Sequence, residues 1–170
     1  VVVSHSPSTL RAKRRIAASF GSQRAGTMRN HYIVVGLGGV GVRVVEQLRD
    51  EGKRVAVIDN DPSPRNVSRA RALGVPVVVA DATDPEALSA ASLNAAAGVA
   101  VLTGSDLANI ETGLAIRSEL ADKRDSVPTV LRLFDRHLST TVRQAFGFRD
   151  VRSTAALAAP WFVAASLGLK

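Results

Sequence analysis

The strongest chemical signal in the sequence is the run Gly36-Leu37-Gly38-Gly39-Val40-Gly41, a G-x-G-x-x-G pattern. It directly follows a short β-branched segment, 32–35, and opens a segment with helical spacing of valine and leucine. The first glycine permits a tight turn, the second lets the backbone approach a pyrophosphate, and the third lets the helix pack closely on the strand. Backbone amides at the helix N-terminus would then face phosphates. The glycines alone are also compatible with a tight turn that holds no ligand.

Asp59 adds the second part of this signal. It follows Ala56-Val57-Ile58 at the end of the next predicted strand, 18 residues after Gly41. A carboxylate in that position can accept hydrogen bonds from both ribose hydroxyls of an adenosine and would repel a 2′-phosphate. The pair therefore predicts binding of NAD or another adenine nucleotide and disfavours NADP. The neighbouring Asp61 precedes Pro62 and has the alternative role of capping the next helix.

Further polar residues follow the later predicted strands. Asp81 ends the third strand, where it could bind an adenine amino group or serve only as a loop or capping residue. Thr103 ends the fourth strand, beside the cleft at which the strand order should reverse. Asp106 and Asn109 lie one turn apart on the following helix, near the same cleft, with a helix cap and an ordinary polar face as the alternative. Arg132 lies within an otherwise apolar strand and needs a partner, either a structural carboxylate or a ligand phosphate.

Residues suited to catalysis are few. His5, His31 and His137 fall in the N-terminal segment, at the entry of a strand and at the start of a helix, where a lone histidine is usually structural or solvated. Tyr32 is the only tyrosine and has no lysine four residues later, and no Walker-A lysine, H-E-x-x-H or G-x-S-x-G motif occurs. The absence of cysteine excludes thiolate chemistry and disulfides. We therefore expect that this chain is not an enzyme. The alternative is a fragment of an NAD-dependent oxidoreductase that lacks its substrate domain.

The elements that must position these residues alternate regularly between strand and helix. The strands are continuous apolar runs, which is typical of strands buried on both faces of a parallel sheet. The pattern predicts an α/β fold: a Rossmann-like, doubly wound, parallel six-stranded sheet followed by a C-terminal helix. The predicted strands are 32–35, 54–58, 76–80, 99–102, 129–134 and 148–151, and the predicted helices are 39–51, 65–73, one beginning at 83–86, 106–121, 136–146 and 155–167, the last started or broken at Pro160.

Charge divides the chain unevenly. Of its 22 basic residues, seven lie in residues 1–43, which contain no acid, whereas residues 44–170 hold 15 basic and 15 acidic residues. The neutral body argues against nucleic-acid binding, which requires a basic face on the fold itself. We therefore predict a basic linker or tail over 1–29, with a juxtamembrane segment near anionic lipid as the alternative, a nucleotide-binding domain over 30–152, and a separate apolar helix over 153–170.

Four motifs in this order resemble the RCK domain, the regulator of potassium conductance, also called the Trk-type NAD-binding domain. They are Ile33–Gly41, Val57–Pro62, Asp81–Pro85 and Thr103–Asn109, and the resemblance covers 31–169. It implies that the candidate cofactor-binding residues are Gly36, Leu37, Gly38, Gly39, Val40, Gly41, Asp59, Asn60, Asp81, Ala82, Thr103, Gly104, Asp106, Asn109 and Arg132, with Asp59 on the adenosine ribose, Asp81 on the adenine side and Thr103 lining the pocket.

The resemblance also implies a function. Such domains are non-catalytic nucleotide sensors on the cytoplasmic side of potassium channels and transporters, with NAD(H), ADP or ATP as ligands. They form dimers and often rings, and the final helix resembles the family's crossover helix, which packs on a partner subunit. Many relatives carry a basic or polar residue at the position of Gly39, so the glycine here predicts weak binding of a triphosphate.

The final helix argues for a partner independently of the resemblance. Residues 155–165 contain no charge, and a helix that is apolar all round must be buried. The predicted sheet already has its own helices on both sides. We therefore expect a homodimer or higher ring through this helix, attached to a membrane channel or transporter subunit. A third hypothesis is an assembly module that binds no ligand at its cleft.

Overall fold

The computed structural model of the chain describes residues 24–121 and 126–168. Most of the predicted basic tail, residues 1–23, lies outside the described part. The elements, in chain order, are β1 (Tyr32–Val35), α2 (Gly39–Asp50), β2 (Val55–Asp59), α3 (Pro64–Ala72), β3 (Val77–Val79), α4 (Pro85–Ala90), the 3₁₀ helix η1 (Leu93–Ala95), β4 (Gly98–Val101), α5 (Asp106–Leu120), β5 (Thr129–Leu133), α6 (Arg136–Phe146), β6 (Asp150–Ser153) and α7 (Thr154–Ser166).

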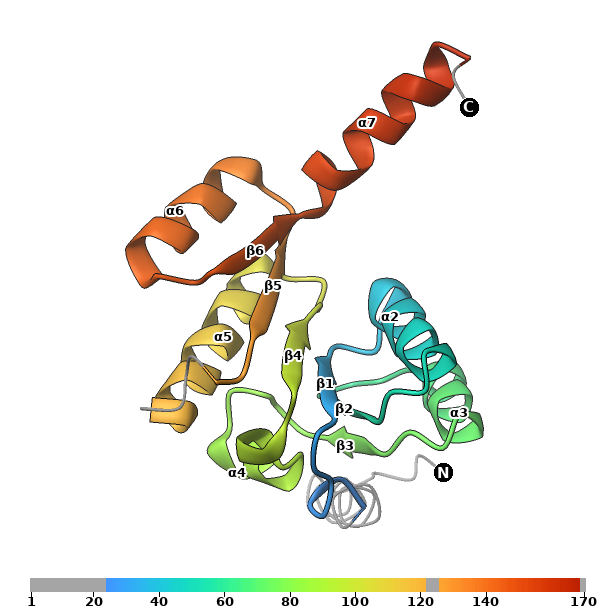
Figure 1. Cartoon of the computed structure of the whole chain (residues 1–170), viewed down its shortest axis with the longest axis vertical. Helices are drawn as coiled ribbons and strands as arrows, with labels where there is room; N and C mark the ends of the chain where they lie inside the picture. The colour runs from blue at the N-terminus through green and yellow to red at the C-terminus, as the bar shows by residue number, and fades with distance from the viewer. Residues whose placement is uncertain (1–23, 122–125, 169–170) are drawn as a thin grey trace, which may run out of the picture.

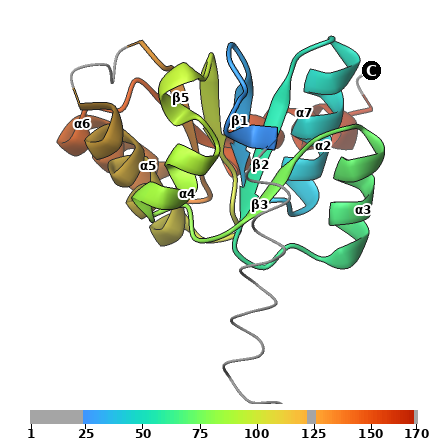
Figure 2. The ribbon, with the colours of Figure 1, turned by 90° about the horizontal axis from the view of Figure 1, so that it is seen from below.

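The six strands form one parallel sheet in the order β3-β2-β1-β4-β5-β6. The doubly wound prediction is therefore confirmed. Helices α2 and α3 lie on one side of the sheet and α4, α5 and α6 on the other (Figures 1 and 2). The strand order reverses between β1 and β4, where doubly wound sheets bind ligands at the carboxyl ends of the strands.

Two apolar clusters hold these layers together. On the α2 and α3 side, Val34 and Val57 pack with Val45 of α2, and all three are at most 1% exposed. On the other side, Ile33 and Leu131 pack with Ile116 of α5, and all three are fully buried. Alternate residues of each strand thus face opposite clusters, which is why the sequence shows unbroken apolar runs.

Local capping signals place most helix ends where the sequence predicts them. Ser63, Ser105 and Asp135 accept hydrogen bonds from first-turn amides of α3, α5 and α6. Asp61 is therefore not the cap of α3. Gly147 ends α6 with a φ of 65°, a left-handed conformation that glycine adopts at low cost.

Two predicted elements differ from the structure. The sixth strand lies at Asp150–Ser153, two residues later than predicted, because Phe148 is a buried loop residue that contributes its ring to the α5 side of the core.

The last helix is continuous from Thr154, with Pro160 inside it and Ser153 as its cap. The carbonyl that Pro160 leaves without a helical partner belongs to Ala156, an exposed residue, so water can bond to it.

His31 is fully buried at the entry of β1 and is structural, as expected for a lone histidine. Its Nε2 donates to the Ala91 carbonyl at 2.9 Å, while its Nδ1 has no hydrogen-bond partner. Burial is the main cause that lowers the pKa of His31 below 6.5, and the nearby Arg54 lowers it further, against the opposing effect of the Ala91 bond.

We expect this histidine to make the fold acid-sensitive. The folded state binds fewer protons at His31 than the unfolded state, so the free energy of unfolding should decrease as the pH falls below about 6.5. Urea unfolding between pH 7.5 and 5.5 should therefore show a decrease that a His31→Gln variant lacks. A His137→Gln variant, changed on the surface of α6, should keep the full decrease. Equal pH dependence of the His31→Gln variant and the unchanged chain would contradict this role of His31.

Candidate nucleotide site

A cavity of about 520 Å³ opens at the carboxyl ends of the strands, across the point where the strand order reverses. Its size falls in the range of small-molecule and cofactor sites. Its lining comes from the glycine turn, the ends of β2 to β5 and the first turns of α5. The lining residues are Val35, Gly36, Gly38, Gly39, Ile58, Asp59, Asn60, Ala80, Asp81, Ala82, Thr83, Leu102, Thr103, Gly104, Ser105, Ala108, Glu111, Thr112 and Arg132.

The glycine turn is built as its spacing predicts. Gly36 has a φ of +92°, and a Cβ on it would lie 2.9 Å from the Thr103 amide nitrogen, so both conformation and space require glycine there. A Cβ on Gly38 or Gly39 would have no atom within 4 Å, so these two residues expose their backbone to the cavity. Gly38 caps α2 without a side-chain hydrogen bond, and the first turn of the helix carries no acid. This helix N-terminus is thus open to an anion.

Gly41 does not line the cavity but closes the packing behind it. A Cβ on Gly41 would overlap the carbonyl oxygen of Gly36. Glycine at this position lets α2 approach β1 closely, which is the role that the motif predicts for its third glycine.

Asp59 ties the glycine turn to the end of β2. Its Oδ2 accepts the Leu37 amide at 2.5 Å, and its Oδ1 accepts the Asp61 amide at 2.8 Å. Each carboxylate oxygen has a further lone pair, so the fixed carboxylate can still accept hydrogen bonds from a ligand. Because Asp59 also lines the cavity, its geometry fits the predicted role as acceptor of ribose hydroxyls.

Asp81 lies across the cavity from the glycine turn, at the end of β3. Its Oδ1 accepts the backbone amide of Thr83 at 2.9 Å and the Thr83 hydroxyl at 2.7 Å. These two bonds lower the pKa of Asp81, the backbone bond most, so the side chain is held as a carboxylate. The residue is therefore both a turn-forming aspartate and a charged acceptor on the cavity wall.

Asn109 and Asp106 hold the loops around the cavity and do not line it. The Asn109 side chain is fully buried; its oxygen accepts the amide and hydroxyl of Thr103, and its nitrogen donates to the carbonyls of Thr103 and Arg132. These four bonds use the whole capacity of an amide side chain. Asp106 accepts the amides of Phe134 and Asp135 at 2.8 and 3.3 Å, and so fixes the turn between β5 and α6.

Arg132 is the one positively charged residue in the described lining of the cavity. Its Nη1 donates to the carbonyls of Leu102 and Thr103 at 3.4 and 3.3 Å, and its guanidinium lies 4.1 Å from the centre of the Phe134 ring. Its Nε is buried without a hydrogen-bond partner, and no described carboxylate lies within ion-pair distance of it. Of the two partners that the sequence leaves open, a structural carboxylate is therefore not found in the described part, and a ligand anion fits.

Ten of the fifteen predicted site residues line the cavity. The five that do not are Leu37, Val40, Gly41, Asp106 and Asn109. Sequence reasoning also missed part of the wall, above all Ala108, Glu111 and Thr112 on α5. Glu111 and Thr112 follow Ala108 by three and four residues, which places all three on one face of α5. This helical spacing could have identified them from the sequence. Within residues 24–121 and 126–168, no group of three or more potential metal ligands occurs.

An alanine at Gly38 offers a test of how the turn meets a ligand. Gly38 has a φ of −77° and free space around a Cβ, so Gly38→Ala should leave the fold and its stability unchanged. The added methyl group would project into the cavity, where a pyrophosphate must approach the backbone. We expect ADP and NADH to bind at least tenfold more weakly and adenosine to bind equally well, as measured by calorimetry. An equal loss for adenosine and ADP would show that the methyl group does not act on the phosphates.

The chain matches a described family. Residues 32–151 match the TrkA-N domain. The putative K(+) efflux antiporter KefB of Alkalimonas amylolytica is 32% identical over 118 residues, which cover 69% of this chain and 17% of that relative. The chain thus spans about a sixth of the length of this curated relative. None of the helices within the described ranges is long and apolar enough to cross a membrane.

Solved structures with the same fold include two isolated domains. The NAD(P)-binding domain of an exopolyphosphatase-related protein from Archaeoglobus fulgidus superposes with a TM-score of 0.68 at 25% identity, covering 83% of this chain and all of that one. The TrkA-N domain of the inner membrane protein YbaL from Escherichia coli gives 0.69 at 20% identity, covering 81% and 96%. The GsuK structure bound to ADP gives 0.61 at 20% identity, covering 75% of this chain and 32% of that one.

Proposed function

The chain belongs to the TrkA-N domain family, and on this premise we propose that its cavity binds an adenine nucleotide, NAD(H), ADP or ATP, to regulate potassium transport. The observation that carries the proposal is the convergence of three features on one cavity: an open helix N-terminus at Gly38, a fixed carboxylate at Asp59, and the guanidinium of Arg132, which has no ion-pair partner among the described carboxylates. Together these offer acceptors for ribose hydroxyls and donors for phosphates.

The binding mode follows from the order of these groups along the strand ends. The adenosine ribose would lie at Asp59, with its adenine toward Asp81, which follows β3 by two residues. The phosphates would lie over the amides of the glycine turn, and Arg132 on the other side of the turn would bind an outer phosphate or the second half of a dinucleotide. Gly39 offers no side chain to a third phosphate, so we expect ADP and NAD(H) to bind more tightly than ATP.

The role would be regulatory and non-catalytic. The described cavity lining contains no histidine, tyrosine, lysine or cysteine, the side chains that most often position a proton or a nucleophile beside a nicotinamide. KefB is a putative K(+) efflux antiporter and GsuK is a channel, so the partner of this domain would be a membrane potassium channel or transporter, with the domain on its cytoplasmic face. An oxidoreductase would instead consume NADH with a carbonyl substrate, which we expect not to occur.

A substitution at Asp59 tests the proposed binding mode. Asp59→Ala should reduce the affinity for NADH and ADP ten- to hundredfold, because the loss of a charge-assisted hydrogen bond costs about 1.5–3 kcal/mol. Titration calorimetry measures these affinities, and thermal shifts with NAD, NADH, ADP, ATP and AMP compare the nucleotides. Asp61→Ala is the matched control, since this neighbouring carboxylate is exposed and lies outside the cavity lining. Unchanged nucleotide affinity of Asp59→Ala would contradict the assignment.

The second part of the proposal concerns assembly. None of the residues of α7 is buried, and Trp161 and Phe162 are 78% and 75% exposed. Apolar exposure on this scale marks an interaction site. We propose that the chain forms at least a homodimer through α7.

A further inference from the structure

The nucleotide cavity extends beyond the adenosine and its two phosphates in the proposed binding mode. The lining reaches from Asp81, after β3, to Arg132 on β5, and the strand order places these two strands four spacings apart. Neighbouring strands lie about 4.8 Å apart, so the lining is about 19 Å wide. An adenosine diphosphate laid from Asp81 to the glycine turn at the end of β1 would cover two of the four spacings. The half of the cavity over β4 and β5 is therefore left for a further group of the ligand.

Three side chains of this half can bind such a group: Glu111 and Thr112 of α5 and Arg132 of β5. Glu111 is exposed and makes no hydrogen bond or ion pair within the described residues, so Arg132 does not neutralise it. Thr112 is only 3% exposed, and its hydroxyl has no hydrogen-bond partner in the same part of the chain. Thr103 differs, because its amide and its hydroxyl both bind the Asn109 side chain. We call Glu111, Thr112 and Arg132 the outer subsite.

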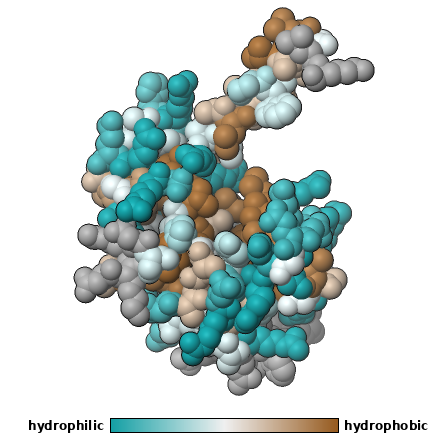
Figure 3. Space-filling view, viewed as in Figure 1, coloured by the Kyte–Doolittle hydropathy of each residue, from teal (hydrophilic) through white to brown (hydrophobic). Residues whose placement is uncertain are grey.

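Helix α5 holds the carboxylate of the outer subsite beside the strands. A Cβ on Gly113 would lie 2.9 Å from the Leu131 side chain, so the helix packs closely on β5 near Glu111. On the face drawn in Figure 3, hydrophilic residues cover α2, α3 and α6, whereas apolar residues are exposed in the middle, below α7. The charged surface thus lies mostly on the outer helices, and a carboxylate without a partner on the cavity wall is an exception. Polar groups that are few and fixed in a cavity determine which ligand it selects.

The charges of the outer subsite distinguish two groups that could extend from the diphosphate. A third phosphate would bring more negative charge toward Glu111, and like charges repel each other. A second ribose would instead offer hydroxyl donors, which a carboxylate accepts in charge-assisted hydrogen bonds, and the Thr112 hydroxyl can donate or accept. Arg132 would bind the phosphate that joins the two sugars.

We propose that Glu111 selects a second ribose over a third phosphate, so that the outer subsite takes the sugar half of a dinucleotide or of ADP-ribose. This inference rests on the nucleotide site proposed above and names its ligand class, a nucleoside diphosphate extended by a sugar. Gly39 only lacks a side chain for a third phosphate, whereas Glu111 acts against one and in favour of a ribose.

Titration calorimetry with ADP, ADP-ribose and ATP tests this selection, since the three ligands share one adenosine diphosphate. In buffer with EDTA, we expect the unchanged chain to bind ADP-ribose about tenfold more tightly than ADP, and ATP about fivefold more weakly than ADP. Glu111→Gln removes the charge but keeps the size of the side chain. This variant should lose most of the preference for ADP-ribose and should bind ATP about as tightly as ADP. The two affinities then change in opposite directions, which partial unfolding of the variant would not produce.

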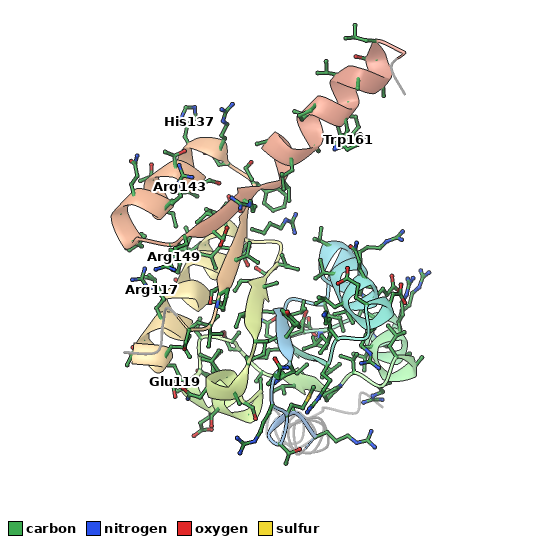
Figure 4. The ribbon with its side chains drawn as sticks, viewed as in Figure 1. Arg117, Glu119, His137, Arg143, Arg149 and Trp161 are labelled. Atoms are coloured by element: carbon green, nitrogen blue, oxygen red, sulfur yellow. The ribbon has the colours of Figure 1, made fainter. Side chains whose placement is uncertain are left out.

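Glu119→Gln is the matched control, because Glu119 lies at the far end of the same helix (Figure 4) and outside the described cavity lining. It should keep the three affinities of the unchanged chain. The same ratio of ADP-ribose to ADP affinity in Glu111→Gln as in the unchanged chain would overturn the proposal. Tighter ATP binding on addition of Mg²⁺, lost in Glu111→Gln, would also overturn it, since Glu111 would then hold a phosphate-bound cation. Absence of ADP binding to the unchanged chain would contradict the nucleotide site itself, and this selection with it.

Discussion

Replacing Gly41 by alanine is expected to lower the free energy of unfolding by about 3 kcal/mol or more. A Cβ on Gly41 would overlap the Gly36 carbonyl oxygen, which belongs to the backbone and cannot rotate away. Helix α2 would have to move off β1, and the buried contacts of Val42 and Val45 would loosen with it. Since whole domains are stable by only about 5–15 kcal/mol, this single methyl group should remove a large fraction of the stability.

Urea unfolding at a fixed protein concentration would measure this effect. Gly39→Ala is the matched control: it lies two residues earlier, at the first position of the same helix, and its Cβ would meet no atom within 4 Å. Alanine there should be neutral or slightly stabilising, since it favours the helix. If Gly41→Ala unfolds at the same urea concentration as Gly39→Ala, then α2 does not approach the glycine turn as closely as the structure places it.

The second large effect is expected from the double variant Trp161→Asp, Phe162→Asp. Burial of these two side chains at about 25 cal/mol per Å² over roughly 150–250 Å² each would favour the dimer by roughly 8–12 kcal/mol before the cost of association. Both rings are more than two-thirds exposed in the single chain, so the charges should not disturb its fold. We expect the double variant to be a folded monomer at concentrations where the unchanged chain is a dimer.

Light scattering at micromolar concentration measures the molar mass and so distinguishes the monomer from the dimer. Leu107→Asp is the control, because Leu107 is also exposed, at 65%, but lies on α5. This control variant should remain a dimer. If the unchanged chain is a well-behaved monomer under these conditions, the assembly proposal is wrong, and α7 has another partner.

Much of this fold could be predicted because its signals are local. The glycine spacing from Gly36 to Gly41 and the unbroken apolar strands fix a parallel doubly wound sheet without reference to distant contacts. Helix caps such as Ser105 and Asp135 are also short-range features, since each side chain accepts a hydrogen bond from an amide three residues later. The sequence pattern predicts the sixth strand two residues too early because Phe148 is an apolar loop residue, and only the packing of its ring against α5 distinguishes it from a strand residue.

The candidate site could be predicted only in part, since some of it depends on tertiary contacts. Asp59 and Asp81 end strands and so could be placed at the cavity from the sequence. The sequence alone does not distinguish Asn109 from a ligand-binding residue. Its four hydrogen bonds join the ends of β4 and β5, which are distant in sequence.

Titration calorimetry of adenosine, ADP and NADH with the unchanged chain tests the central claim most directly. We expect one adenine-nucleotide site per chain, tighter binding of ADP and NADH than of adenosine, and a ten- to hundredfold loss of affinity for ADP and NADH in Asp59→Ala. Absence of binding heat for all three ligands at millimolar concentration, at two temperatures, would contradict the claim. The cavity would then belong to an assembly module whose charged residues are structural.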